Sequence, residues 1–430
     1  MAGEWREIAL GELVEIFDAP HATPPKTNEG PVFLGISNLA QGRLDLSNTE
    51  HLSKDDYMRW TRRVEPKPDD VVFSYETCIG EAALIPSDLR CCLGRRMGLL
   101  RARAGKVDNR FLLYAYLGPQ FQEIIRSRTV HGSTVDRIPL IDMPRFPIRV
   151  PEDVGEQRAI AYILGTLDDK IELNRRMNET LEAMARAIFK SWFVDFDPVR
   201  AKAEGRDPGL PKPLTDLFPD HFEESELGEI PAGWEVGTFG EVSENPRRGI
   251  KPAKIQESTP YIGLEHMPRR CIALADWGHA DELESNKFQF KRGEILFGKL
   301  RSYFHKVGIA PVDGVCSTDI LVIAPRQPTW FGFVLEQASS VEFVDHTDAA
   351  STGTKMPRTN WQDMARYQIA LPPVSVAAAF TALVQPLVEH IIASIHESRT
   401  LAALRDTLLP KLLSGELRVK NAETFMEKDV

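Results

Sequence analysis

Two stretches of this 430-residue chain carry the same ladder of apolar residues, 220 positions apart. The first ladder starts at Leu164, and its apolar residues recur at every third or fourth position, which is the spacing of one face of a long helix. Asn174 and Asn178 interrupt its middle, and Ser394 and Ser398 interrupt the second ladder at the same steps. Two ladders with the same central interruption rarely align by chance, so we interpret the chain as a duplication of a unit of about half its length.

The matched residues predict a seam along each of two helices, and eight of the nine pairs agree in polarity. The seam residues are Leu164, Leu167, Ile171, Asn174, Asn178, Leu181, Ala185, Ile188 and Trp192 in the first helix, and Val384, Leu387, Ile391, Ser394, Ser398, Leu401, Arg405, Leu408 and Leu412 in the second.

The repeat extends outward from the helices, with an offset that drifts from 229 to 221 as insertions accumulate. Short runs of β-branched and aromatic residues bounded by Gly, Pro and Asp dominate before Pro151 and Pro372, and helical periodicity dominates after them,. Each half is therefore predicted to be a mixed α/β globule followed by one long helix. The corresponding pairs include Trp5 and Trp234, Gly11 and Gly240, Phe33 and Tyr261, Asp70 and Glu294, Cys92 and Cys316, Gly132 and Gly353, and Phe146 and Tyr367.

Length and composition are typical of a cytoplasmic protein with two or more domains. No stretch approaches the roughly 18 consecutive apolar residues that span a bilayer, and the first residues lack the basic and apolar regions of a signal peptide,. The five cysteines are odd in number and form no CxxC pair, which indicates reduced thiols. Neither a zinc site nor any other metal site is expected.

The net charge of −10 at first argues against a nucleic-acid partner,. Nine of the ten surplus negative charges, however, lie in residues 151–235, which hold 10 basic and 19 acidic residues. The two globules are neutral overall. A basic stripe on one face of a globule is compatible with this if acidic residues elsewhere on the same globule balance its charge.

Basic residues inside both globules occur together with aromatic and small polar residues, the types that contact base edges and phosphates. The alternative for any one of them is a solvated loop charge, and the case for DNA rests on basic loops that recur in both halves. The candidate DNA-binding residues are Arg59, Arg62, Arg63, Arg95, Arg96, His131, Ser133, Thr134 and Arg137 in the first globule, and Arg247, Arg248, Lys251, Lys254, Lys299, Arg301, Tyr303, Lys306, Thr354, Lys355 and Arg358 in the second.

The first seam rises over the 28 residue steps from Leu164 to Trp192, or roughly 42 Å at 1.5 Å per residue, which is slightly more than one turn of DNA at about 34 Å. Its spacing is that of a coiled coil, and Asn174 with Asn178 resembles a polar device that fixes register. The two helices can pair antiparallel within one chain, which would place the globules at opposite ends. The alternatives are that each helix packs on its own globule, or that the seams pair between chains.

Catalytic motifs are missing from the sequence: it contains no nucleophile elbow, phosphate loop, HExxH zinc motif or dinucleotide fingerprint,. Asp168 with Asp169, and Asp195 with Asp197, are close carboxylate pairs. We interpret them as structural, with the first pair on the solvent face of the helix. No catalytic or cofactor-binding residue is therefore assigned.

Several segments resemble the specificity subunits of type I restriction-modification systems, and together they extend over nearly the whole chain before residue 419. Residues 168–182 with 189–196 look like the central conserved helix of that family, which is its most specific local signature. Residues 151–160 and 409–417 are similar to its flanking conserved blocks, and residues 297–301 with 317–321 look like the recurring core of its target recognition domains.

The resemblance implies an α+β fold in which two pseudo-repeated mixed α/β target recognition domains are separated by two long antiparallel coiled-coil helices. It implies that each domain reads one half of a bipartite, asymmetric double-stranded DNA site, and that the helices act as a ruler for the gap. It also implies a non-catalytic subunit that bridges two methyltransferase subunits, which use S-adenosylmethionine to methylate adenine; motor-nuclease subunits join these for cleavage.

The resemblance divides the chain into six parts. The second helix departs from the family pattern, because it carries serines in place of the asparagine pair and has Arg405 in its seam. Two other functions stay open: a stand-alone enzyme that modifies nucleic acid, and a protein-binding scaffold with duplicated domains. The expected parts are residues 1–152 and 234–373 as target recognition domains, 153–197 and 374–418 as conserved helices, 198–233 as a linker and 419–430 as a tail.

Overall fold

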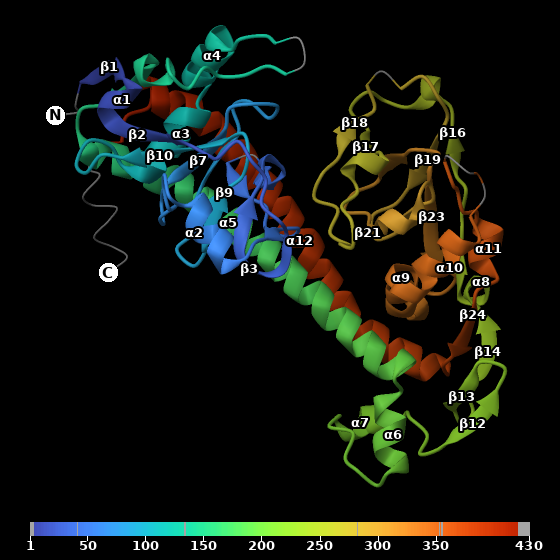
Figure 1. Ribbon diagram of the computed structural model, residues 1–430. Helices are drawn as coiled ribbons and strands as arrows, with labels where there is room; N and C mark the ends of the chain where they lie inside the picture. The colour runs from blue at the N-terminus through green and yellow to red at the C-terminus, as the bar shows by residue number, and fades with distance from the viewer. Residues whose placement is uncertain are drawn as a thin grey trace. The chain divides into compact units, whose positions relative to one another are not determined.

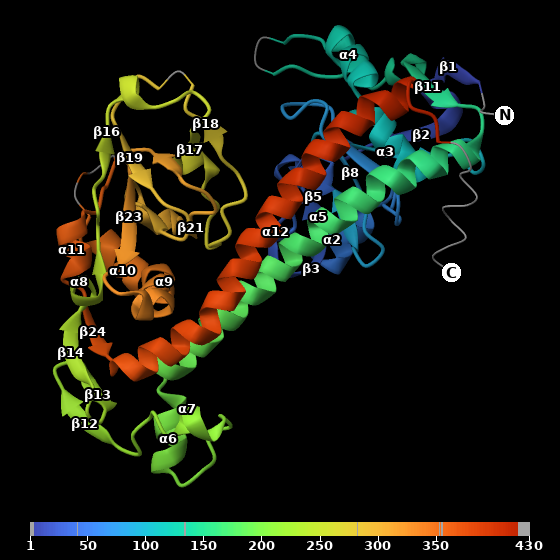
Figure 2. The same cartoon turned by 180° about the vertical axis from the view of Figure 1, so that it is seen from behind.

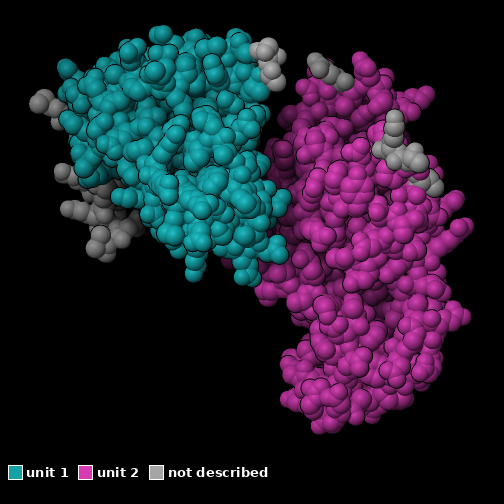
Figure 3. All heavy atoms as spheres, in the orientation of Figure 1, with its two compact units in different colours: residues 1–169, 401–430 teal, residues 170–400 magenta. Residues whose placement is uncertain are grey.

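The computed structural model describes residues 4–40, 42–132, 135–281, 283–351, 353 and 356–419. It divides into two compact units, residues 1–169 with 401–430 and residues 170–400 (Figure 3). Each unit holds one globule and one part of each of two long helices, α5 (Val154–Phe189) and α12 (Val374–Ser414). A π-helical turn, Lys190–Val194, extends α5.

The globule of the first unit is built around a four-stranded antiparallel sheet in the order β2-β10-β7-β8, beside a smaller sheet in which β3 runs parallel to β9. Its elements are β1 (Trp5–Ala9), α1 (Leu10–Leu13), β2 (Val14–Asp18), β3 (Thr27–Leu34), β4 (Leu39–Ala40), β5 (Arg43–Leu44), β6 (Glu50–His51), α2 (Lys54–Trp60), β7 (Val71–Ser74), β8 (Ala82–Leu84), β9 (Cys91–Leu93), β10 (Met97–Ala102), α3 (Asn109–Leu117), α4 (Pro119–Arg128) and β11 (Pro147–Pro151).

In the second unit, a small appendage follows α5 and leads into the globule of that unit. The elements of the appendage are α6 (Asp197–Ala203), α7 (Lys212–Thr215), β12 (Phe222–Ser225) and β13 (Gly228–Pro231). Those of the globule are β14 (Glu235–Thr238), α8 (Phe239–Val242), β15 (Ser243–Glu244), β16 (Gly249–Ile250), β17 (Pro260–Ile262), β18 (Gly278–His279), β19 (Lys287–Phe290), β20 (Ile295–Gly298), β21 (Val307–Ile309), β22 (Gly314–Cys316), β23 (Ile320–Pro325), α9 (Phe331–Ser339), α10 (Val341–Ala349), α11 (Trp361–Ala365) and β24 (Gln368–Leu371).

The two globules repeat one topology, which confirms the duplication. The order β2-β10-β7-β8 recurs as β15-β23-β20-β21, and the parallel pair β3 and β9 recurs as β17 and β22. In each globule the first strand also pairs with the strand that leads into the long helix, β1 with β11 and β14 with β24. This last pairing closes each globule immediately before its helix begins.

Local sequence explains how these elements start and end. All four residues of β7 and all four of β20 are buried, as expected for continuous apolar runs in the middle of a sheet. The carboxylate of Asp108 accepts the backbone N–H of Phe111 and so caps α3, while Pro119 occupies the first turn of α4,.

Within the second unit α5 and α12 run antiparallel. The Asn174 side-chain amide donates to Glu397 at 2.7 Å and to Ser398 Oγ at 3.2 Å. In the π-helical turn after α5, the centre of the Trp192 ring lies 5.9 Å from that of Phe380. The C-terminal end of α5 therefore lies beside the N-terminal part of α12. The polar interruptions of the two seams therefore face each other.

The first unit contains the other part of the same antiparallel pair. Leu164 shares a buried cluster with Leu412, and Arg405 donates to Asp168 at 2.8 Å. The Tyr114 hydroxyl of α3 donates to the same carboxylate at 2.6 Å. Asp168 thus joins both helices to the globule, and its assignment to the solvent face was wrong, since Arg405 and Tyr114 together cover it.

All 18 seam residues lie in buried or half-buried positions, and Figures 1 and 2 show α5 and α12 side by side within each unit. The expected fold class, with two repeated α/β globules and two antiparallel helices, is confirmed. With its π-helical turn α5 ends at Val194, and α12 ends at Ser414; the expected ends were 197 and 418. Residues 198–233, expected as a linker, form the folded appendage.

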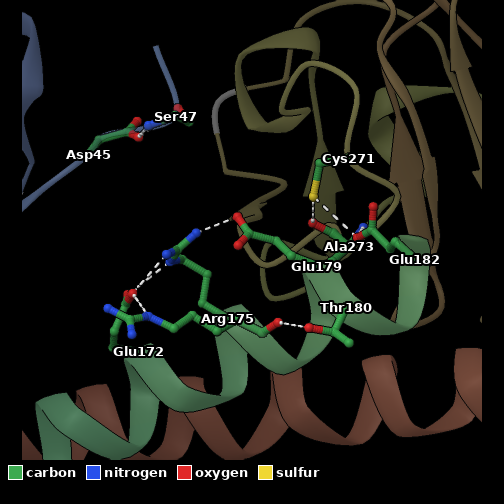
Figure 4. Close-up of polar contacts among 10 residues, drawn as sticks. Asp45, Ser47, Glu172, Arg175, Glu179, Thr180, Glu182, Cys271 and Ala273 are labelled. Carbon is green, nitrogen blue, oxygen red and sulfur yellow. Dashed lines mark hydrogen bonds and ion pairs between the residues drawn. The ribbon is translucent and has the colours of Figure 1, made fainter. Parts of the chain in front are cut away.

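Within the second unit, α5 is also fixed to the second globule. The carboxylate of Glu182, which is 5 % exposed, accepts the backbone N–H groups of Ile272 at 3.0 Å and Ala273 at 3.1 Å. The Cys271 thiol donates to it at 3.3 Å (Figure 4). Burial raises the pKa of Glu182, against these hydrogen bonds, which lower it.

Helix α12 is long and apolar enough to cross a membrane by length and composition alone, a test that a buried core helix also passes. Its apolar residues have two burial partners, α5 and the second globule, which explains why it is apolar over more than a narrow seam. Val384 and Ile391 of the seam are at most 1 % exposed, and so are Phe380 and Ile395. All five cysteines are free thiols, as expected.

We expect Arg405→Leu to lower the free energy of unfolding by about 1 to 3 kcal/mol, because it leaves the half-buried Asp168 carboxylate without its guanidinium partner. Urea titration followed by circular dichroism measures this change. The control is Arg176→Leu, which removes an exposed pair with Glu172 and should cost less than about 1 kcal/mol. Equal losses in the two variants would contradict the assigned role.

A second prediction concerns Glu336 of α9, which is 3 % exposed and whose pKa burial raises to about 8 from 4.5. Between these pH values the folded state holds a proton that the unfolded state has released, so the free energy of unfolding falls as pH rises, at most by about 1.4 kcal/mol per pH unit. We expect Glu336→Gln to remove this slope. Urea titrations at pH 5, 6.5 and 8 measure it, and the exposed Glu342→Gln is the control; a slope unchanged in Glu336→Gln would contradict the prediction.

Candidate nucleic-acid interface

In the first globule, three loops that are far apart in sequence meet where β7 ends. Tyr75 follows β7, and its N–H donates to the carbonyl of Arg96, in the turn between β9 and β10, at 3.2 Å. The N–H of Ile138 donates to the carbonyl of Tyr75 at 2.8 Å, and a β-bridge joins Glu76 to Arg137. We call residues 75–77, 95–96 and 137–138 the first junction.

The second globule builds the same backbone arrangement where β20 ends. The N–H of Lys299 donates to the carbonyl of Asp319 at 2.9 Å, and the N–H of Thr359 donates to the carbonyl of Lys299 at 3.1 Å. A β-bridge joins Leu300 to Arg358. Residues 299–301, 318–319 and 358–359 form this second junction, in which these two hydrogen bonds and the β-bridge each have a counterpart in the first.

Both junctions contain a non-glycine residue with a left-handed backbone at the equivalent place. Thr77 has φ 68° and Arg301 has φ 53°. Each lies in a hairpin loop, β7 to β8 or β20 to β21, and each loop holds a second left-handed residue, Gly80 or His305. A side chain in this conformation costs about 1 to 2 kcal/mol, so the repeated strain points to positions kept for a purpose other than stability.

The side chains at the two junctions differ although the backbones agree. In the first, the Arg96 guanidinium lies 3.0 Å from the Glu76 carboxylate and donates to Thr77 Oγ1 at 3.2 Å. In the second, Arg358 donates to Asp319 at 2.9 Å, and this pairing raises the pKa of Arg358. One scaffold therefore presents two different polar surfaces.

The structure brings several candidate residues to the junctions. His131 pairs with Asp136 at 3.0 Å in the loop that leads to Arg137. Arg63 donates to Asp18 at 2.8 Å. His21 lies 3.8 Å from the same Asp18 carboxylate, and its ring centre lies 6.5 Å from that of Tyr75. The candidates at or beside a junction are Arg63, Arg95, Arg96, His131 and Arg137 in the first globule, and Lys299, Arg301, Tyr303, Lys306 and Arg358 in the second.

Other candidates lie away from the junctions. Arg248 pairs with Glu294, which precedes β20 and so lies at the opposite end of that strand from the second junction. Arg59 and Arg62 are exposed at the end of α2, and Arg247, Lys251 and Lys254 are exposed around β16. Ser133, Thr134, Thr354 and Lys355 lie outside the described residues.

Sequence reasoning missed the acidic partners Glu76 and Asp319 and a basic-aromatic cluster beside the second junction. In that cluster the Arg269 guanidinium lies 4.0 Å from the centre of the Phe304 ring. The Lys306 ammonium donates to the carbonyl of Leu264 at 2.5 Å, and burial lowers the pKa of Lys306. The consecutive arginines 269 and 270 were a readable signal, whereas the acidic partners depend on the fold.

Among the residues that the structure describes, no group of three or more His, Cys, Asp or Glu side chains could hold a metal ion. What the junctions offer instead is guanidinium, hydroxyl and amide groups at exposed loops. These groups donate hydrogen bonds to phosphates and to base edges, so the arrangement suits binding of a nucleic acid.

Comparison with known proteins gives matches to one family. Residues 2–183 match the model of the type I restriction modification DNA specificity domain. The type I restriction enzyme HindI specificity subunit of Haemophilus influenzae is 27 % identical, over 96 % of this chain and 100 % of its own length. The MjaIX specificity subunit of Methanocaldococcus jannaschii is 29 % identical, over 73 % of this chain and 70 % of its own.

The fold also resembles a solved structure. The crystal structure of a type I restriction-modification S subunit from M. genitalium superposes with a TM-score of 0.54 at 15 % identity, covering 95 % of this chain and 96 % of the other. At this identity the likeness concerns the fold alone, and it extends over both globules and both long helices.

The left-handed backbone at Arg301 predicts unequal effects of two substitutions. Glycine adopts this conformation freely, so Arg301→Gly should change the free energy of unfolding by less than about 1 kcal/mol. Arg301→Val places a β-branched residue there and should be less stable than the glycine variant by about 1 to 2 kcal/mol. Urea titration of both variants measures the difference, and equal stability would contradict the assigned backbone.

Proposed function

The chain belongs to the specificity subunits of type I restriction-modification systems, and from this premise we propose that it reads a bipartite, asymmetric DNA site. In this proposal residues 1–152 and 234–373 are target recognition domains, and each reads one half-site. The observation that carries the proposal is the junction built twice on one backbone with different side chains. Equal scaffolds with unequal reading surfaces suit two unequal half-sites in one duplex.

Two globules that each read a half-site add their discrimination against wrong bases. A good bidentate contact discriminates by about 1 to 3 kcal/mol against the wrong base, so a few contacts in one globule leave many competing sites in a genome. Two globules joined by paired helices also select the distance between their half-sites. In this role α5 and α12 act as a ruler, and the Asn174 contacts with Glu397 and Ser398 support a fixed helix register.

The chain itself is proposed to be non-catalytic. The chemistry would come from two methyltransferase subunits that bind S-adenosylmethionine and methylate adenine, bridged by this subunit, and from motor-nuclease subunits that join them for cleavage. The complex would act in the cytoplasm, where the DNA is.

An exchange of residues 236–371 for the corresponding globule of another specificity subunit tests the division of labour. We expect the recognised sequence to change in one half-site only, as measured by methylome sequencing of cells that also carry the methyltransferase subunit. A protein-binding scaffold would show no sequence change, and a stand-alone enzyme would show S-adenosylmethionine binding by the purified chain; either result would replace the proposal.

Deleting one heptad from each helix tests the ruler. Removing residues 171–177 together with the facing residues 395–401 shortens the pair by about 10 Å at 1.5 Å per residue, which corresponds to about 3 base pairs. The methylome should then show a shorter gap between unchanged half-sites. The control is substitution of the exposed Met184 by alanine, which should leave the gap as it is. A gap unchanged by the deletion would contradict the ruler.

A further inference from the structure

The two junctions each contain an arginine with a left-handed backbone, but at exchanged places. In the first junction it is Arg96, with φ 75°, in the turn between β9 and β10. The counterpart of Arg96 in the second junction is Asp319, and the arginine there is Arg301, in the hairpin loop. The counterpart of Arg301 in the first is Thr77. The exchange keeps one left-handed arginine in each junction but moves it from the turn between two strands to the hairpin loop.

The two arginines differ in what holds them. Arg96 is restrained by Glu76 and Thr77. The Arg301 guanidinium has no hydrogen-bond or ion-pair partner among the residues described here, and only its backbone is engaged, through its N–H to the carbonyl of Pro357 at 2.8 Å. The carboxylate of the second junction, Asp319, is already paired with Arg358.

The backbone gives a second, independent argument. Arg301 has φ 53° and ψ 60°, and His305 at the other end of the short Ser302–Phe304 turn has φ 50° and ψ 56°. His305 has a structural reason for its place, because its ring is 7 % exposed and contacts the carbonyl of Ser339 at 2.9 Å. Arg301 has no such internal contact, although glycine would relieve the strain. The side chain of Arg301 is therefore available for a contact outside the chain.

Building on the function proposed above, we propose that Arg301 is the specificity-determining residue of the second globule and reads a guanine of its half-site. The planar guanidinium donates two parallel hydrogen bonds, which match the N7 and O6 acceptors of guanine in the major groove. Of the four bases only guanine presents two acceptors side by side there. A lysine keeps the charge and loses the two-pronged geometry.

The test uses the full chain assembled with its methyltransferase subunit, in three variants: Arg301→Lys, Arg301→Gly and the control Arg326→Lys. Arg326 is exposed, lies 3.9 Å from Glu244, and belongs to neither junction. Methylome sequencing gives the recognised site, and methylation rates on duplexes that differ at one base give the discrimination. The exchange of residues 236–371 identifies the half-site that the second globule reads.

We expect Arg301→Lys and Arg301→Gly to relax one position of that half-site from guanine to several bases. The rate ratio between guanine and adenine at that position should fall by about 10-fold or more. The other half-site and the gap should stay as in the wild type, Arg301→Gly should be fully folded at the start of the urea titration, and Arg326→Lys should match the wild type throughout.

Three outcomes overturn the inference. Retained guanine preference in Arg301→Lys and Arg301→Gly shows that the residue does not read a base. Uniformly slower methylation of all duplexes, with a weaker dependence on salt, shows a phosphate contact instead. A wild-type complex with no bipartite preference overturns the proposed function itself, and so is distinguished from the first two outcomes, in which the wild type keeps its site.

Discussion

The antiparallel pairing of α5 and α12 is the constraint on which the rest of the structure depends. A long apolar seam alone would allow the helices to slide by whole turns, because one layer of leucines resembles the next. Polar contacts remove this freedom: Asn174 bonds to Glu397 and Ser398 in the second unit, and Asp168 bonds to Arg405 in the first. Each contact is satisfied at one alignment only, so the polar residues fix which layers meet.

The same polar residues also connect the helices to the globules. Asp168 accepts from Tyr114 of α3 as well as from Arg405, and Glu182 accepts two backbone N–H groups of the second globule. A half-buried charge left without such partners is costly, so each globule is tied to the helix pair at a defined place. This fixed attachment is what a reader of half-site spacing requires.

Apolar periodicity predicted the duplication and the two helices, because it is a local property that survives without any contact, and the family resemblance implied the fold class. The sequence did not predict Asp168 correctly, since the residues that cover its carboxylate, Tyr114 and Arg405, lie 54 and 237 positions away. The basic loops were visible as composition, but the junctions were not. Backbone hydrogen bonds such as that from Lys299 to Asp319 leave no mark on residue type, and left-handed arginines have no sequence signal.

The central claim is that one scaffold, built twice, reads two different half-sites at a set distance. Methylome sequencing of cells that carry this chain with its methyltransferase subunit tests it most directly. The account predicts one bipartite motif whose two halves differ in sequence, separated by a gap of constant length and non-specific sequence. A contiguous motif, two identical halves or a variable gap would contradict it.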